Sequence, residues 1–509
     1  MPKSILKYYP ESGGRVFVLF LLFSLAIYQF VSAGFNSFAI ICLLPLLVPI
    51  IYVAFTWRMS FFWLLIVVNY FIQFLNKNQW IPNGIPLSMY NELIEILLIA
   101  IAIVDARQSP HFDRAGSLML LTICCWCGFC TLEVLNDCCD IGLDIGNWYA
   151  GFRMIALQLL YAYIVFVLYI TTPERLNTYL KLWAFLSLFS AFWTWKQINL
   201  GMTPREYTWL WTSGYVTHVL NGGTLIRWFS TFNDAASYGI NAAASALTFF
   251  VIAIMGRIKK ERIFYAVIGF IVLWGMFQSG TRTAIFCLFA GFAVFLVLSK
   301  SVKIIVPSAI AGGLFVCFLM FTNIGNGNQQ IRRMRSAFNK NDASANVRDI
   351  NQEAIKKYLQ DAPFGIGLGT STDRIPTNNK FYKVSVIPPD SEYVYIWIRT
   401  GVVGITVFLI LTVIMFLGAC WTVFFKIKNR SLVGVGAGLC GAFVAIQLGG
   451  YGNQVLMQFP NGLIFYGGLS IVYVLPYIEP AWVEMEEKLF AEQEERKRLK
   501  LEKKKLSRV

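Results

Sequence analysis

Residues 401–425 read GVVGITVFLILTVIMFLGACWTVFF, a run without a single charged side chain. An α-helix needs about 20 apolar residues to cross the hydrocarbon core of a bilayer, and this run is long enough. Similar runs recur along the chain, which is 57% hydrophobic and only 14% charged, whereas soluble domains are about 25% charged. The sequence therefore predicts an all-α polytopic membrane protein without a sizeable soluble domain.

We predict about 14 transmembrane helices within residues 1–479, followed by a charged cytoplasmic tail over residues 480–509. The first apolar run is followed at once by a second, which favours a retained helix over a cleaved signal peptide. The predicted spans lie near residues 15–34, 36–55, 59–76, 86–104, 115–135, 148–170, 178–197, 236–255, 263–278, 282–299, 303–323, 391–425, 431–451 and 461–477.

The positions of Lys and Arg predict the orientation of these helices, because short cytoplasmic loops are enriched in both residues. An even number of spans puts both termini in the cytoplasm, and the loops then assigned to that side are the basic ones. The formal charge of +15 thus reflects topology and does not indicate nucleic-acid binding. The cytoplasmic set is Lys3, Lys7, Arg58, Arg107, Arg114, Arg175, Arg257, Lys259, Lys260, Arg262, Lys300, Lys303, Lys426, Lys428 and Arg430.

One large external loop is predicted over residues 324–390, and loops of this length translocate regardless of their charge. Apolar residues recur in it at helical spacing until Pro363, which predicts an amphipathic helix over residues 346–361. The residues of this pattern are Val347, Ile350, Ala354, Tyr358 and Leu359. Arg332, Arg333 and Arg335, earlier in the loop, are interpreted as surface charge.

The cysteines give no metal-site pattern, because Cys127 and Cys130 lie in an apolar run without a second pair or a nearby histidine. We therefore predict no metal and no cofactor. Cys138 and Cys139 lie in a predicted external loop, where a disulfide with an unidentified partner is one alternative.

Four predicted external segments carry charged or glycine-rich patterns. They are RWFSTFNDA (227–235), SGTRTA (279–284), NVR (346–348) followed by PFGIGLG (363–369), and DSEYVYIWIRTGVVG (390–404). Their order resembles the O-antigen ligase and O-antigen polymerase superfamily of bacterial surface polysaccharide assembly, over about residues 200–410. The matching positions are Arg227, Arg282, Arg348, Pro363, Gly365, Gly367, Tyr393, Gly401 and Gly404.

One position departs from the family pattern. Asp390 stands where the ligases of this family carry histidine, and Ser391 replaces the asparagine that follows. Of the two histidines, His111 is assigned to the cytoplasm. His218 lies in a predicted external loop and is an alternative to the missing histidine.

The resemblance implies a donor glycan linked to polyprenyl (undecaprenyl) pyrophosphate, used on the periplasmic face of a bacterial inner membrane. Guanidinium groups fit phosphate oxygens with paired donors and stay charged, so Arg227, Arg282 and Arg348 are the predicted pyrophosphate ligands.

A sugar hydroxyl attacks better when a base takes its proton, and Asp390 and Glu392 are the candidates for this base. Asp390 could equally cap the following helix. The resemblance further implies inversion at the anomeric carbon.

Three functions are open at this point. A polymerase would join two lipid-linked oligosaccharides, whereas a ligase would move the glycan to lipid A core or to protein. The missing histidine favours the polymerase. A polysaccharide transporter or flippase is the alternative from another class. The expected partners are a lipid-linked oligosaccharide donor, a glycan or lipid-glycan acceptor, and membrane lipid.

Overall fold

The computed structural model describes residues 55–81, 87–105, 111–220, 223, 225–327, 329–335, 343–370 and 374–506, with scattered positions between 17 and 53. The chain divides into two compact units, Met1–Phe62 and Trp63–Val509. The predicted spans near 15–34 and 36–55, and with them the retained first helix, lie largely outside the described residues. Everything below concerns the second unit and α2, the helix that leads into it.

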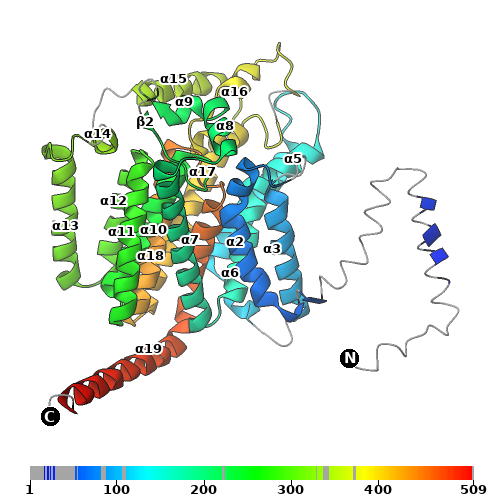
Figure 1. The fold of residues 1–509 in the computed structure, drawn as a ribbon. Helices are drawn as coiled ribbons and strands as arrows, with labels where there is room; N and C mark the ends of the chain where they lie inside the picture. Colours follow the sequence, from blue (N-terminus) through cyan, green and yellow to red (C-terminus); the bar gives the residue numbers. More distant parts are fainter. Residues whose placement is uncertain are drawn as a thin grey trace. The chain divides into compact units, whose positions relative to one another are not determined.

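Long helices form the second unit (Figure 1). They are α2 (Arg58–Lys77), α3 (Leu87–Val104), α4 (Leu118–Leu132), α5 (Ile145–Phe152), α6 (Gln158–Tyr169), α7 (Pro173–Asn199), α10 (Ala235–Met255), α11 (Lys259–Gln278), α12 (Thr283–Leu298), α13 (Val302–Phe321), α17 (Glu392–Trp421), α18 (Arg430–Gly452) and α19 (Gly467–Leu506). Short 3-10 or π-helical turns adjoin several of them: η2 (Phe112–Ala115), η3 (Glu133–Leu135), η4 (Arg153–Leu157), η8 (Thr422–Lys426) and η9 (Gly462–Tyr466).

All twelve predicted spans from residue 59 onward coincide with helices. Among the described residues, nine helical segments are long and apolar enough to cross a bilayer. The other three predicted spans correspond to α7, α12 and α13. The polytopic helical fold is confirmed at this level, while the total of 14 spans stays a prediction.

Small residues bring α10, α12 and α18 together at the centre of the unit. Helix α10 contains NAAASAL and α18 contains GVGAGLCGAF, and nearly all their residues are buried. A Cβ on Gly291 of α12 would collide with the carbonyl oxygen of Gly441 in α18. Close backbone approach of this kind is a common way for helices to associate in membranes, where no hydrophobic effect drives them together.

The connecting segments separate into two groups at opposite ends of the helices (Figure 1). One end, called here the loop-rich end, carries α8 (Pro204–Thr212), α9 (Tyr215–His218), α14 (Gln329–Arg335), α15 (Ala343–Tyr358), α16 (Tyr382–Val386) and a hairpin of β1 (Val219–Leu220) and β2 (Leu225–Ile226). The stretch 200–235 thus contains two short strands that the all-α prediction did not include.

The opposite end, called here the basic end, holds the described segments from Arg114 onward that are predicted to be cytoplasmic. Arg114 donates to the carbonyl of Thr171, and Lys300 donates to that of Ile427. Arg257 pairs with Glu486 of α19, with 3.4 Å between Nη1 and Oε2. Basic residues that the positive-inside rule assigns to the same side of the membrane therefore lie at the same end of the helices, although they come from separate loops.

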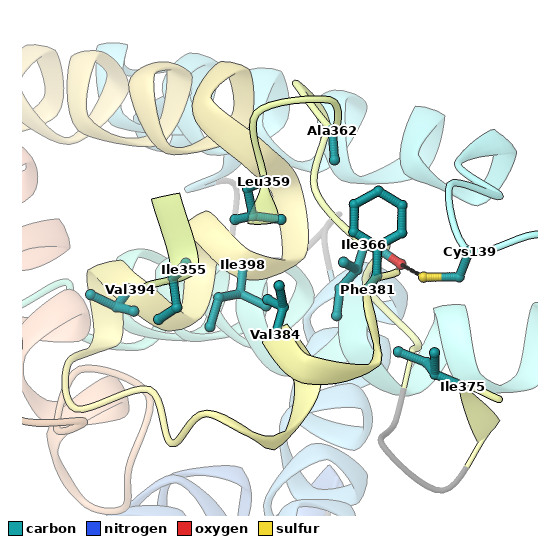
Figure 2. Close-up of a cluster of buried hydrophobic side chains, with 10 residues drawn as sticks. All are labelled: Cys139, Ile355, Leu359, Ala362, Ile366, Ile375, Phe381, Val384, Val394 and Ile398. Atoms are coloured by element: carbon teal, nitrogen blue, oxygen red, sulfur yellow. Dashed lines mark hydrogen bonds between the residues drawn. The ribbon is translucent and has the colours of Figure 1, made fainter. Parts of the chain in front are cut away.

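Helix α15 is the amphipathic helix predicted in the long loop, but only part of the predicted apolar pattern is buried. Leu359, as predicted, and Ile355 enter an apolar cluster (Figure 2). Val347 and Ile350 remain 53% and 65% exposed. The buried cluster consists of Cys139, Ile355, Leu359, Ala362, Ile366, Ile375, Phe381, Val384, Val394 and Ile398. It joins α15 to α16, to the first turns of α17 and to the segment after α4.

The glycines of PFGIG (363–367) allow this segment to pack closely against a kink in α17. Gly401 has φ 65° and ψ −170°, a backbone conformation that L-residues rarely adopt. Val403 donates its N–H to the carbonyl of Pro363 at 3.1 Å, and Gly367, with φ 94°, donates to the carbonyl of Arg399 at 3.0 Å. A Cβ on Gly401 would collide with the Pro363 carbonyl, and one on Gly365 would meet the backbone of residues 398–401.

We expect Gly401→Ala to destabilise the protein by at least about 1–3 kcal/mol, because alanine is strained at this φ and its Cβ overlaps the Pro363 backbone. Thermal unfolding of the purified protein measures this change. Gly128→Ala is the matched control, since Gly128 lies inside α4 and a Cβ added there would meet no atom within 4 Å. Equal melting temperatures for G401A and the parent would contradict the close-packing argument.

Candidate functional site

The turn Ser279–Arg282, between α11 and α12, is the centre of the candidate site. Arg227 follows β2, and its backbone N–H donates to the His218 carbonyl, which extends the hairpin. Its guanidinium donates to the carbonyl of Ser279 through Nε (3.4 Å) and to Thr281 Oγ1 through Nη2 (3.1 Å). A third bond runs from Nη1 to the Thr217 carbonyl at 2.9 Å. The first two motifs of the sequence thus meet directly.

Two further arginines reach the same place from the long loop. Arg333 of α14 donates through Nε to the carbonyl of Gly280, at 2.7 Å, in the middle of the turn. Arg348 of α15 donates through Nη2 to the carbonyl of Gly452 at the end of α18, also at 2.7 Å. Gly452 packs against Thr283, the residue after Arg282. Arg333 was interpreted as surface charge from the sequence, and the structure corrects this.

The four guanidinium groups lie within electrostatic reach of one another. Burial, followed by the charges of Arg227 and Arg282, lowers the pKa of Arg333 to about 9. Burial and the neighbouring arginines also lower the pKa of Arg227 and of Arg282, although Asp234 opposes the change at Arg227. Arginine remains protonated in proteins, so these directions identify a strongly positive region.

Two helix N-termini add to this positive region. Arg282 is the N-cap residue of α12, and Asp234 caps α10, where its side chain accepts the N–H of Ser237. Backbone N–H groups and the helix dipole favour anions at such ends. We call Arg227, Arg282, Arg333 and Arg348 the arginine cluster.

Asp390 is joined to α15, the helix that carries Arg348, and Glu392 is buried. Asn351, one helical turn after Arg348 on α15, donates its amide to Asp390 Oδ2 at 2.9 Å. Glu392 is buried, and its carboxylate accepts the N–H of Leu456 at 3.2 Å, in the segment after α18. The N-cap of α17 is Ser391, which accepts the N–H of Val394. The alternative that Asp390 caps this helix is therefore wrong.

His218 is a buried structural residue and does not replace the missing histidine. Its Nε2 accepts the N–H of Ala235 at the start of α10, and its Nδ1 lies 3.1 Å from the carbonyl of Gly214. Burial, reinforced by Lys77 and Arg227, lowers the pKa of His218 to about 3. The ring is neutral at physiological pH and both nitrogens have partners.

The remaining motif residues connect helices. The hydroxyl of Tyr393 donates to Gln447 of α18 at 2.9 Å, and Gly404 lies against Thr400 and Phe129. Arg399 lies in the second turn of α17, and its guanidinium carbon is 5.5 Å from the centre of the Tyr395 ring. Cys138 and Cys139 are both free thiols, so the disulfide alternative finds no support here.

The fold and the site define a polytopic helical membrane protein with a guanidinium cluster at the loop-rich end of its helices. Residues 267–409, which run from within α11 to just past the middle of α17, match the family model described as O-antigen ligase. This match confirms the resemblance to the O-antigen ligase and polymerase superfamily, whose members are glycosyltransferase-like membrane enzymes. A comparison with curated proteins gives no match.

We expect the stability of the protein to fall as the pH drops below about 6.5, because the unfolded chain then binds a proton at His218 that the folded protein excludes down to about pH 3. The contribution of this one residue approaches about 1.4 kcal/mol per pH unit. Melting temperatures of the parent and of His218→Gln between pH 7.5 and 5 measure it. An identical pH slope in H218Q would show that His218 is not the group responsible.

Proposed function

We propose that the protein transfers a glycan from polyprenyl pyrophosphate to a sugar hydroxyl on the periplasmic face of a bacterial inner membrane, as a polysaccharide polymerase. The arginine cluster is the observation that supports this proposal most directly. Its members come from four separate segments and meet around the turn Ser279–Arg282. A diphosphate would offset the mutual repulsion of the four charges.

The chemistry follows from the charge that develops during transfer. The bond between the anomeric carbon and the pyrophosphate oxygen breaks while the acceptor oxygen attacks from the opposite side, which inverts the anomeric centre. The electron pair of the broken bond stays on the pyrophosphate. Guanidinium groups fixed in advance stabilise this charge more in the transition state than in the ground state, and no metal ion is needed.

Asp390 is the proposed base that takes the proton of the attacking hydroxyl. Its carboxylate is half-buried and oriented by Asn351, which lies one turn from Arg348. Glu392 is less suitable, because its carboxylate binds the backbone of Leu456 and is only 5% exposed. We therefore assign Glu392 a structural role at the start of α17.

An apolar groove among the helices offers room for a polyprenyl tail. It encloses about 810 Å³ between α10, α11, α12 and α13, and it runs from Lys259 and Arg262 at the basic end to the middle of these helices. Leu273, Phe289 and Phe315 line its part toward the loop-rich end. A polyprenyl chain in this groove would bring the donor from the bilayer to the arginine cluster. The loop-rich end then faces the periplasm and the basic end faces the cytoplasm.

A ligase that moves the same donor glycan to lipid A core or to protein is the second candidate, because the matched family model carries that description. Glycan analysis of a deletion strain separates the two activities. Loss of a polymerase leaves single repeat units on the acceptor, whereas loss of a ligase leaves the acceptor without glycan. Unchanged lipid-linked glycans accumulating on the cytoplasmic side would instead indicate the transporter or flippase.

We expect Arg333→Lys to lower turnover by about 10- to 100-fold without lowering the protein level, because lysine keeps the charge but loses paired donation to phosphate oxygens. Lysine at Arg282 or Arg348 has the same expected effect. Transfer from a purified lipid-linked donor measures the rate. Arg332→Lys is the matched control, since Arg332 is exposed and donates to the carbonyl of Asn326. Equal rates for R333K and R332K would remove Arg333 from the proposed site.

We expect Asp390→Asn to lower the rate of transfer by about 10²- to 10⁴-fold, because the amide cannot accept the proton of the attacking hydroxyl. Glu392→Gln should be milder, since its amide oxygen still accepts the N–H of Leu456. Both rates are measured at saturating donor. The reverse ranking of the two variants would move the base to Glu392.

A further inference from the structure

A second groove lies at the basic end, far along the helices from the arginine cluster. It encloses about 760 Å³ between the start of α4, the last turns of α17 and the first third of α19. Its wall on α17 consists of Ile414, Leu417, Gly418, Trp421 and Thr422, which share one face of the helix, and it ends at Lys426. The groove is open to the surface, since Leu417 and Trp421 are 57% and 58% exposed.

Positive groups gather at the end of this groove that belongs to the basic end. Arg114 lies 5.4 Å from the ring centre of Tyr477 and donates to the Thr171 carbonyl, which fixes its guanidinium beside the groove. Lys426 closes the groove on the side of α17. Gly116, Ser117 and Leu118 place the N-terminus of α4 against the same space. Two cations and a helix dipole thus favour an anion here.

The groove has the length of one leaflet. Ile414 and Lys426 are separated by roughly 18 Å along a helix at 1.5 Å per residue, and half of a bilayer core is about 15 Å. Trp421 and Tyr477 lie near the charged end, the level at which amphipathic aromatic residues meet lipid headgroups. Apolar side chains line the part toward the middle of the membrane.

We propose that this groove binds an anionic glycerophospholipid of the leaflet at the basic end. The phosphate and its headgroup lie between Arg114, Lys426 and the start of α4, and one acyl chain lies along Leu118, Ile414 and Leu417. Basic pockets between transmembrane helices on the cytoplasmic side are typical sites for anionic lipid. The assignment does not depend on the reaction proposed for the arginine cluster.

The test compares phosphatidylglycerol with phosphatidylcholine of the same acyl chains, added to the full-length protein in neutral detergent. We expect phosphatidylglycerol to raise the melting temperature by about 3 °C or more above the rise given by phosphatidylcholine. The double variant Arg114→Gln/Lys426→Gln should lose this difference. The control Lys303→Gln/Lys428→Gln removes two cations from the same end outside the groove and should keep it.

A third variant keeps the test conclusive if loss of Arg114 unfolds the protein. Leu417→Trp fills the groove without changing the charge, and it should reduce the number of phosphatidylglycerol molecules retained in native mass spectra by one. Equal stabilisation by both lipids would overturn the proposal. So would an equal loss in the control double variant, which would indicate general attraction between charges, or an unchanged lipid count in L417W.

Discussion

Repulsion among four guanidinium groups is the constraint around which the loop-rich end is organised. Arg227 reaches the region from the segment after β2, Arg333 and Arg348 reach it from two helices of the long loop, and backbone carbonyls hold each of them. The turn at Ser279–Arg282 supplies two of these carbonyls and the fourth guanidinium. Holding like charges together costs free energy in every state without an anion, and in the proposed function a diphosphate would offset that cost. The packing of α10, α12 and α18 provides the rigid base that withstands this repulsion.

The sequence is sufficient for the helices and for three of the four arginines that the structure brings together. Apolar runs of bilayer length predict helices reliably because no other single-segment structure satisfies its own backbone hydrogen bonds in lipid. The order of short motifs identifies Arg227, Arg282 and Arg348. Arg333 could not be selected in this way, because QQIRRMR contains three arginines and only the tertiary fold decides which of them faces Gly280.

The other sequence-based predictions that the structure corrects failed for similar physical reasons. Apolar residues in and just after α15 occupy more than one face, and periodicity predicts burial of Val347 and Ile350 together with Leu359. The cluster under the helix instead buries Leu359 with Ile355 and leaves the first two exposed. Asp390 and Ser391 are adjacent and both are good capping residues. The sequence therefore does not show which of them caps α17, and in the structure it is Ser391. The hairpin at Val219–Ile226 is too short to give an alternating pattern.

Helix α15 carries Arg348 and, one turn later, Asn351, which orients Asp390. One and two turns beyond Asn351, Ile355 and Leu359 fasten this segment to the apolar cluster (Figure 2). Any tilt of α15 on that cluster therefore moves Arg348 and Asn351 together. In the proposed reaction, one rigid-body motion of this helix would change both the contact with the donor diphosphate and the orientation of the base.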